Sequence, residues 1–335
     1  MVKYIIKRLA VSIIILLGVS IIIYTMVRLM PTDYVDTKYA SQLQSGTITQ
    51  EDIAHFKSLY GIGDNSFEGI VGGYAKWITN LAKGDLGLSF KYEKPVGQVI
   101  SENMWVSFAI AVIATILQFS LSVPLGISSA TNQYSLKDYA VTFFTMIGIS
   151  LPTYFFAAIV VKVFSVDLGL FPPSGLISAT ANYPSGLYGE LQKLLDIAHH
   201  LFLPILVSVL LSIGGLMRYT RTNMLEVLTA DYIRTARAKG LSEKSVVYKH
   251  AFRNTMIPLV TMLAGILPSL FGGMMITEQV FGIDGIGRLA YQALREGDIP
   301  FVMGYNMFLA ILTVIGTLLS DIMYSVVDPR VKLGK

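Results

Sequence analysis

The chain has 335 residues, of which 53% are hydrophobic and only 14% charged, and its mean hydropathy is +0.59. Soluble domains carry about a quarter charged residues, so this composition predicts a membrane protein. The lack of cysteine excludes disulfides and thiol catalysis, and no GxxxxGKS/T or GxSxG pattern occurs. The four histidines show no metal-ligand spacing, so nothing in the sequence indicates an enzyme or a metal site.

Six uncharged runs are long enough to cross a hydrocarbon core of about 30 Å at 1.5 Å per residue. They are Leu9–Val27, Asn103–Leu136, Tyr139–Val161, Ile197–Met217, Asn254–Thr277 and Ile299–Ser320. The first run is longer than the apolar part of a signal peptide, so we expect a retained helix. The sequence therefore predicts an all-α polytopic membrane protein with six transmembrane helices.

Basic residues decide the expected orientation. Six spans place both termini on one side, and that side holds Lys3, Lys7, Arg8, Arg218 and a basic loop around residue 240. Lysine and arginine gather in the short cytoplasmic loops of membrane proteins. The bias predicts a multi-pass protein of a bacterial or archaeal cell membrane with both termini in the cytoplasm.

Residues 31–102 form the one large outer element of this arrangement. Within it, the stretch TITQEDIAHFKSLYGIG predicts a short helix with Thr49 as N-cap, Asp52 in the first turn and Gly61 as the stop. We expect a cap that packs on the outer ends of the spans. The predicted parts are a first helix (1–30), this cap, a five-helix core (103–328) that contains an inner loop (218–253), and a tail (329–335).

The inner loop contains the most polar stretch of the chain, YIRTARAKGLSEKSVVYKHAFRN, from Tyr232 to Asn254. Apolar periodicity predicts one helix over about residues 223–239, and Gly240 follows where a left-handed residue ends a helix. Ser242 then caps a second helix, with Glu243 in its first turn and Val247 and Ala251 on its apolar side. The sequence predicts two helices that meet at a glycine bend.

Two interpretations of this loop stay open on spacing alone. A basic helix can lie on anionic lipid, as many inner loops do. Alternatively, the small residues Ala236, Ala238 and Gly240 at the bend allow another protein to approach closely.

Several stretches resemble one family in order along nearly the whole chain. TARAKGLSEKSVVYKHAFRNTMIP is similar to the cytoplasmic EAA-type loop of ABC importer permeases, in the form of the dipeptide/oligopeptide/nickel group, first-permease type. The first span, GDLGLSF, LGLFPPSG, TEQVFGIDGIG and DIMYSVVDPRVK resemble the same family. The resemblance implies the type I importer fold with an external cap.

The resemblance also implies function and partners. It implies half of a translocation pore for short peptides, a homologous second permease, two ATP-binding cassette subunits that bind Mg-ATP, and an external binding protein. The chain itself would hold no cofactor and contact membrane lipid but no nucleic acid. The residues that it places in the ATPase-coupling loop are Ala236, Gly240, Leu241, Ser242, Glu243, Val247 and Ala251.

Other polar residues have a functional and a structural interpretation. Glu278 and Phe281 are candidates for an outer gate, although Glu278 also suits an interfacial acid at a span end. Asp321, an acid inside the last span, is either functional or paired with a structural partner such as a cytoplasmic-side arginine. The candidate pore-lining residues, which also suit helix–helix packing, are Gln118, Ser122, Ser212 and Asn306.

Three other functions compete with peptide import for this sequence. A permease for nickel or a metal chelate shares the fold and the loop. A channel or ion-coupled secondary transporter would need paired intramembrane charges or inverted repeats, and only Asp321 lies within a predicted span. A membrane-anchored scaffold is disfavoured because Pro124 predicts a kinked second span and because the inner loop is basic.

Overall fold

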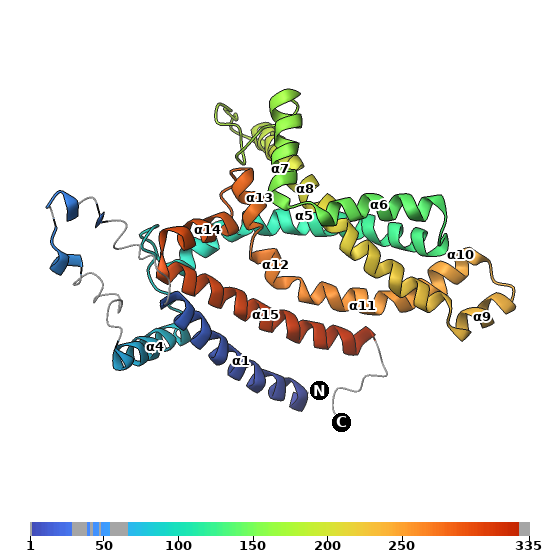
Figure 1. Cartoon of the computed structure of the whole chain (residues 1–335), viewed down its shortest axis with the longest axis horizontal. Coiled ribbons are helices and arrows are strands. Elements are labelled where there is room, and N and C mark those ends of the chain that lie inside the picture. Colours follow the sequence, from blue (N-terminus) through green and yellow to red (C-terminus); the bar gives the residue numbers. More distant parts are fainter. Residues whose placement is uncertain (1, 29–38, 41–42, 47, 54–65, 328–335) are drawn as a thin grey trace.

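The computed structural model of the chain describes residues 2–28, 39–40, 43–46, 48–53 and 66–327. Regular structure in these residues is helical, with one isolated β-bridge. Among them, four helices are long and apolar enough to cross a membrane. They are α1 (Val2–Arg28), α5 (Val96–Thr131), α8 (Leu187–Leu228) and α15 (Ile299–Val327). Helices α5 and α15 and the second part of α8 run roughly along the long axis of the molecule, and α1 runs obliquely beside α15 (Figure 1).

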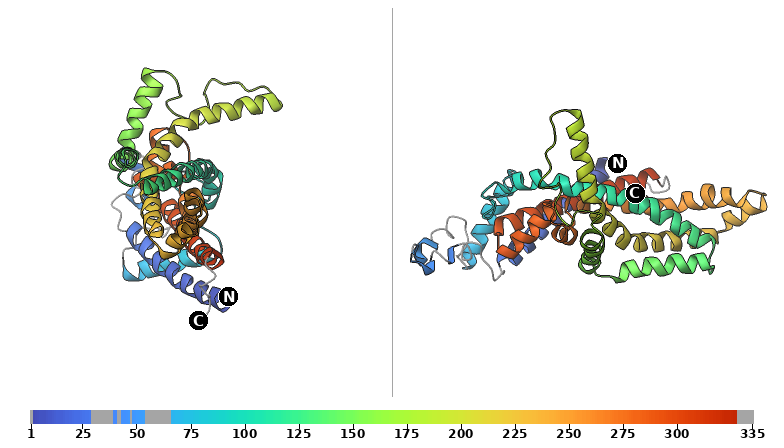
Figure 2. Two further views of the ribbon diagram at one scale, coloured as in Figure 1. Left: turned by 90° about the vertical axis from the view of Figure 1, so that its right-hand side faces the viewer. Right: turned by 90° about the horizontal axis from the view of Figure 1, so that it is seen from above.

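The third predicted span is not one straight helix. It consists of α6 (Leu136–Ser150), α7 (Thr153–Val160) and the π-helical turn η1 (Val161–Asp167), and the two parts are bent by 103°. A proline disfavours helical dihedrals in the residue before it, and Leu151 before Pro152 is extended with φ −85° and ψ 131°. Consequently α7 projects sideways from the bundle, as does the first part of α8 (Figure 2).

The fifth predicted span is also interrupted. Its residues form α11 (Phe252–Gly265), α12 (Leu267–Phe271) and α13 (Met275–Val280). Gly273 between α12 and α13 has φ +74°, a conformation that favours glycine and ends the helix. Counting the bent pair as one span, five spans in the described residues are long and apolar enough to cross a membrane, and this broken segment is not among them. The count of six spans stays a prediction.

Helix α8 extends beyond the predicted fourth span at both ends. It continues to Leu228, and α9 (Asp231–Ala238) starts after a break at residues 229–230. The prediction of one helix over residues 223–239 is therefore wrong, because Ala230 adopts an extended conformation with ψ 148°. The loop continues with α10 (Glu243–Ser245) and the π-helical turn η2 (Val246–Ala251), which leads directly into α11.

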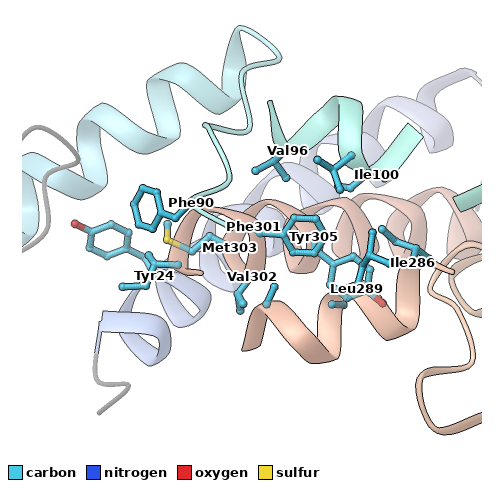
Figure 3. Close-up of a cluster of buried hydrophobic side chains, with 14 of the residues drawn as sticks. Tyr24, Phe90, Val96, Ile100, Ile286, Leu289, Phe301, Val302, Met303 and Tyr305 are labelled. Carbon is cyan, nitrogen blue, oxygen red and sulfur yellow. The ribbon is translucent and has the colours of Figure 1, made fainter. Parts of the chain in front are cut away.

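The largest apolar cluster of the described residues lies at the end of the bundle where α1 ends and α15 begins. The charge bias predicts that this end faces outward, so it is called the outer end. Side chains of Tyr24, Phe90, Val96, Leu289 and Phe301 meet there (Figure 3). They come from α1, the segment before α5, α5 itself, α14 (Ile286–Glu296) and α15. Helix α4 (Phe67–Ala82) adds partly buried aromatic rings to the same cluster. The outer segments are thus packed on the outer ends of the spans.

A buried acid fixes this outer end. Asp298, which is 0% exposed, accepts hydrogen bonds from Ser89 Oγ at 2.5 Å and from the backbone N–H groups of Phe90 and Lys91 at 3.1 and 3.0 Å. It also caps the start of α15 through Phe301 N at 3.3 Å. The GDLGLSF stretch is thereby tied to the beginning of the last helix.

Only the start of the predicted cap helix, residues 48–53, lies in the described part of the chain. Thr49 and Asp52 cap each other's backbone, with Thr49 N 2.8 Å from Asp52 Oδ2 and Asp52 N 3.2 Å from Thr49 Oγ1. The start of that helix is confirmed. Gly61 and the tail 329–335 lie outside the described residues.

The first and last helices are joined near the termini. Arg8 Nε of α1 lies 3.1 Å from Asp321 Oδ2 of α15, and Arg8 Nη2 donates to Oδ1 at 3.4 Å. The beginning of α1 and the end of α15 therefore lie at the same end of the bundle (Figure 1). The structural interpretation of Asp321, an arginine partner, is confirmed.

Candidate functional site

The inner loop packs against the ends of α5 and α8 and forms the tip of the molecule there. Buried apolar residues of α9 and η2 form one cluster with Ile127 and Ala130 of α5 and Met224 of α8. The loop residues in this cluster are Ile233, Ala236, Val246, Val247 and Ala251. Because they are at most 6% exposed, α9 and η2 are held as one body with the inner ends of the spans.

The bend at the tip has the predicted geometry. Gly240 has φ +76°, its N–H donates to Arg237 O at 2.9 Å, and the next N–H donates from Leu241 to Ala236 O at 3.4 Å. These two bonds close the helix end in the pattern that requires a left-handed residue. Ser242 then accepts a hydrogen bond from Ser245 N at 3.4 Å, which confirms the predicted N-cap.

An exposed ion pair spans the bend. Arg237 Nη2 donates to Glu243 Oε1 at 2.6 Å, and the side chains are 44% and 62% exposed. The hydrogen bond from Arg237 lowers the pKa of the Glu243 carboxyl, and the same contact raises the pKa of Arg237. The pair joins α9 to α10 without closing the tip to solvent.

The residues expected in the coupling loop fall into two groups. Gly240, Leu241, Ser242 and Glu243 are exposed at the tip, whereas Ala236, Val247 and Ala251 are buried inside this chain. The buried group builds the loop and offers no surface to another molecule. Tyr248 of η2 is 55% exposed and was not singled out from the sequence, where a lone tyrosine among basic residues gives no clear signal.

A buried ion pair supports the tip from the side, and the sequence did not reveal it. Arg221 of α8 donates to both carboxylate oxygens of Asp138 of α6, at 3.0 Å from Nε and 2.9 Å from Nη2. Ser129 of α5 donates to Asp138, and Tyr134 N adds a bond at 3.0 Å. Asp138 is 3% exposed, so this bidentate pair locks α5, α6 and α8 together where the loop begins.

The outer gate candidates are buried in the described structure. Glu278 is 1% exposed and Phe281 is 2% exposed. Phe281 packs among Ile110 and Leu203, and its carbonyl accepts from Gly175 N at 2.9 Å. Neither side chain lines an open surface in this chain, so a gating role would act through the segments that they hold.

The candidate pore-lining residues all hydrogen-bond to backbone carbonyls. Gln118 Nε2 donates to Ser212 O at 3.2 Å, and Ser122 Oγ donates to Ile213 O at 3.1 Å, which ties α5 to α8. Ser212 and Asn306 donate within their own helices, at 3.1 and 2.7 Å. Ser122 is 0% exposed, while Gln118, Ser212 and Asn306 keep exposed surface.

In the part of the chain that the structure describes, no group of three or more His, Cys, Asp or Glu side chains could hold a metal ion.

Apolar helices long enough to cross a membrane, packed against the basic tip at one end and tied by Asp298 at the other, make this chain a multi-pass membrane protein. The chain belongs to the family described as binding-protein-dependent transport system inner membrane component, which its residues 122–333 match. It is thus a permease subunit of an ABC importer and no enzyme, since ATP hydrolysis belongs to a separate ATPase subunit. The family implies ATPase and binding-protein partners.

Relatives match the chain from end to end. It is 36% identical over 333 residues to the oligopeptide transport system permease protein AppB of Bacillus subtilis (strain 168), covering 99% of this chain and 100% of the relative. It is 34% identical over 332 residues to a putative peptide transport system permease protein of Brucella abortus (strain 2308), covering 99% of each. A solved structure titled as inward-facing conformations of the MetNI methionine ABC transporter aligns with a TM-score of 0.49 at 17% identity, covering 69% of this chain and 97% of that one.

Proposed function

We propose that this chain forms half of the translocation pore of an ATP-driven importer of short peptides. The observation that carries the proposal is the full-length likeness to permeases named for oligopeptide and peptide transport. A match over 99% of the chain includes the spans and the outer loops, which are the parts that would contact a substrate. This likeness favours peptides over nickel or a metal chelate.

The proposed assembly contains a homologous second permease, two ATPase subunits beneath the membrane and an external binding protein. Mg-ATP binds to the ATPases, and this chain carries no cofactor. Both termini lie in the cytoplasm of a bacterial or archaeal cell, an orientation supported by Lys3, Lys7, Arg8 and the basic inner loop. The Arg8–Asp321 pair supports this arrangement, because it joins the two helix ends that this orientation places inside.

The inner loop is the coupling element of this proposal. Its exposed tip, from Gly240 to Glu243 together with Tyr248, would sit in a groove on an ATPase subunit. The buried side of the loop and the Asp138–Arg221 pair keep the tip rigid relative to α5 and α8. A rigid tip transmits movement of the ATPases to the spans, which then alternate between inward-open and outward-open states.

The substrate path follows the partly exposed polar groups of the spans. Gln118 of α5, Ser212 of α8 and Asn306 of α15 are our candidates, because each keeps exposed surface while its polar group is hydrogen-bonded. Ser122 is fully buried and holds α5 against α8 instead.

Transport by proteoliposomes that contain the complete complex tests the proposal. Labelled tri- and tetrapeptides, presented with the binding protein, are expected to accumulate only with ATP, and a complex with a catalytically inactive ATPase gives the baseline. Accumulation of nickel without peptide would establish the metal alternative instead. Failure of any ATPase subunit to co-purify with the chain would contradict the importer assignment.

A further inference from the structure

The carboxylate of Glu278 joins three separate parts of the outer end. Ser107 Oγ of α5 donates to Glu278 Oε1 at 2.6 Å, and Met274 N donates to the same oxygen at 2.9 Å. Arg288 N, in the first turn of α14, donates to Oε2 at 2.8 Å. Ser107 Oγ in turn accepts from Ile286 N at 2.9 Å, so one serine links α5 both to Glu278 and to the start of α14.

Glycines make this close approach possible. A Cβ atom on Gly285 would lie 2.5 Å from Glu278 Cδ and 2.5 Å from Ser107 Oγ, and one on Gly287 would lie 2.8 Å from Met275 N. Neighbours at such distances would have to move. Both glycines are therefore required by the packing around Glu278.

The donors that reach Glu278 in the described structure are a hydroxyl and two backbone N–H groups. A buried carboxylate without a cation depends on these hydrogen bonds, which are of the strong, charge-assisted kind. The bonds exist only while α5, α13 and α14 are together. Separation of these elements would break all three bonds and expose the carboxylate to water.

The chain runs from the coupling loop to this cluster with one interruption. Residues from Glu243 through η2 and α11 are helical without a break up to Gly265, and α12 then leads to the turn at Gly273 beside Glu278. Helices α11 and α12 therefore connect the inner loop to the outer segment, and the turn at Gly273 lies next to Glu278.

We infer that Glu278 is a positioning residue that latches the outer segment, residues 273–288, to α5, and that this latch must release when the outer side of the pore opens. The inference rests on the proposed importer function and assigns Glu278 a role through buried hydrogen bonds rather than as a surface gate. The same residues set the resting state of the transporter.

The test compares ATP hydrolysis by the reconstituted complex with and without its binding protein. Glu278→Gln keeps the size of the side chain but removes the charge, and its amide cannot accept all three bonds. We expect basal hydrolysis without binding protein to rise about tenfold, a shift of about 1.4 kcal/mol, and stimulation by binding protein to fall accordingly. Ser107→Ala should shift both rates in the same direction by a smaller factor.

The control is Gln279→Ala, which alters an exposed side chain next to Glu278 on the same segment and should leave the ratio of stimulated to basal hydrolysis unchanged. A purely structural role of Glu278 predicts that both rates fall together with the amount of folded complex, at a constant ratio. That constant ratio in Glu278→Gln and Ser107→Ala would overturn the inference.

A second measurement uses the chain without partners, so it stays readable if the importer assignment fails. Spin labels on cysteines at Glu102 of α5 and Leu294 of α14, both exposed, report the distance between the two elements in this cysteine-free chain. One narrow distance distribution is expected with Glu278, and a second, longer population with Glu278→Gln. Identical distributions would contradict a latch.

Discussion

Arg8 and Asp321 form an ion pair between the first and the last helix, at the end of the bundle where α1 begins and α15 ends. Their side chains are 43% and 22% exposed, so the pair is partly withdrawn from solvent. Helix α1 is otherwise sparsely buried within the fold. This ion pair is therefore one of the contacts that hold α1, together with the packing of Tyr24 and the hydrogen bond between the Ser20 and Tyr74 hydroxyls.

The first prediction concerns this pair. Asp321→Asn and Arg8→Gln should each lower the thermal midpoint of the purified protein, while the double variant should lose little more than either single one, with a coupling of about 1 kcal/mol. The charge-swapped double variant, R8D with D321R, should recover part of the loss. If the double variant Arg8→Gln with Asp321→Asn loses as much stability as the two single variants together, the two side chains do not interact.

The buried pair of Asp138 and Arg221 should matter more. Asp138→Asn leaves Arg221 partly buried without its carboxylate, which costs about 3 kcal/mol or more when a buried pair is broken. We expect a lower thermal midpoint and loss of ATPase co-purification, measured at equal membrane abundance. Lys137→Ala, an exposed change next to it, serves as the control. Equal behaviour of the two variants would contradict a supporting role for the pair.

Gly240 gives a third prediction. Gly240→Val places a β-branched side chain at φ +76°, which costs about 1–2 kcal/mol locally, although no atom of this chain lies within 4 Å of the added Cβ. If the exposed tip docks on an ATPase, this variant loses co-purification while the spans still insert. Lys244→Ala and Lys249→Ala should be mild, at roughly 0–1 kcal/mol each. A loop that only binds anionic lipid would show the reverse order.

A pH dependence follows from the ion pair across the bend. The hydrogen bond from Arg237 holds the pKa of Glu243 below its ordinary value of 4.5, so the pair stabilises the fold above pH 4.5 and loses this contribution as pH falls through the lowered pKa. The side chains are largely exposed, which limits the effect to under about 1 kcal/mol. Thermal midpoints of the wild type and Glu243→Gln should differ at pH 6 and converge once the pH falls below the lowered pKa of Glu243. A constant difference would refute the linkage.

Orientation can be tested by labelling. A cysteine at Ser66, the exposed N-cap of α4, should react with an impermeant maleimide in intact cells, and one at exposed Ser242 should not. The wild-type chain contains no cysteine, so it provides the background. The opposite pattern would invert the membrane topology.

Local signals in the sequence were sufficient for the tip of the inner loop. A glycine that needs a left-handed conformation and a serine N-cap depend on near neighbours, and both Gly240 and Ser242 adopt the predicted geometry. For Asp321 the sequence left open a functional role or a structural partner such as an arginine, and the structure supplies Arg8 as that partner. The family resemblance, confirmed by the family match, then placed these elements in a permease.

Interactions between distant segments could not be predicted in the same way. Hydropathy measures whether a run can enter a membrane, so it did not reveal the bend before Pro152 or the turn at Gly273. Asp138 looked like one more acid of an inner loop, because its partner Arg221 lies 83 residues further along the chain. The burial of Glu278 likewise depends on Ser107, which is 171 residues away.

The hydrogen bonds that Asp298 accepts from residues 89–91 have a consequence for the biogenesis of the protein. Its bonds to Phe90 and Ser89 join residues 208 and 209 positions apart, so the earlier segment leaves the ribosome long before its partner is made. The outer region between the first two spans must therefore wait, with its backbone donors in water, until the last span has been inserted. The outer end can therefore fold completely only after the final helix has been synthesised and inserted. In a chain truncated before residue 298, that region should be open to proteases.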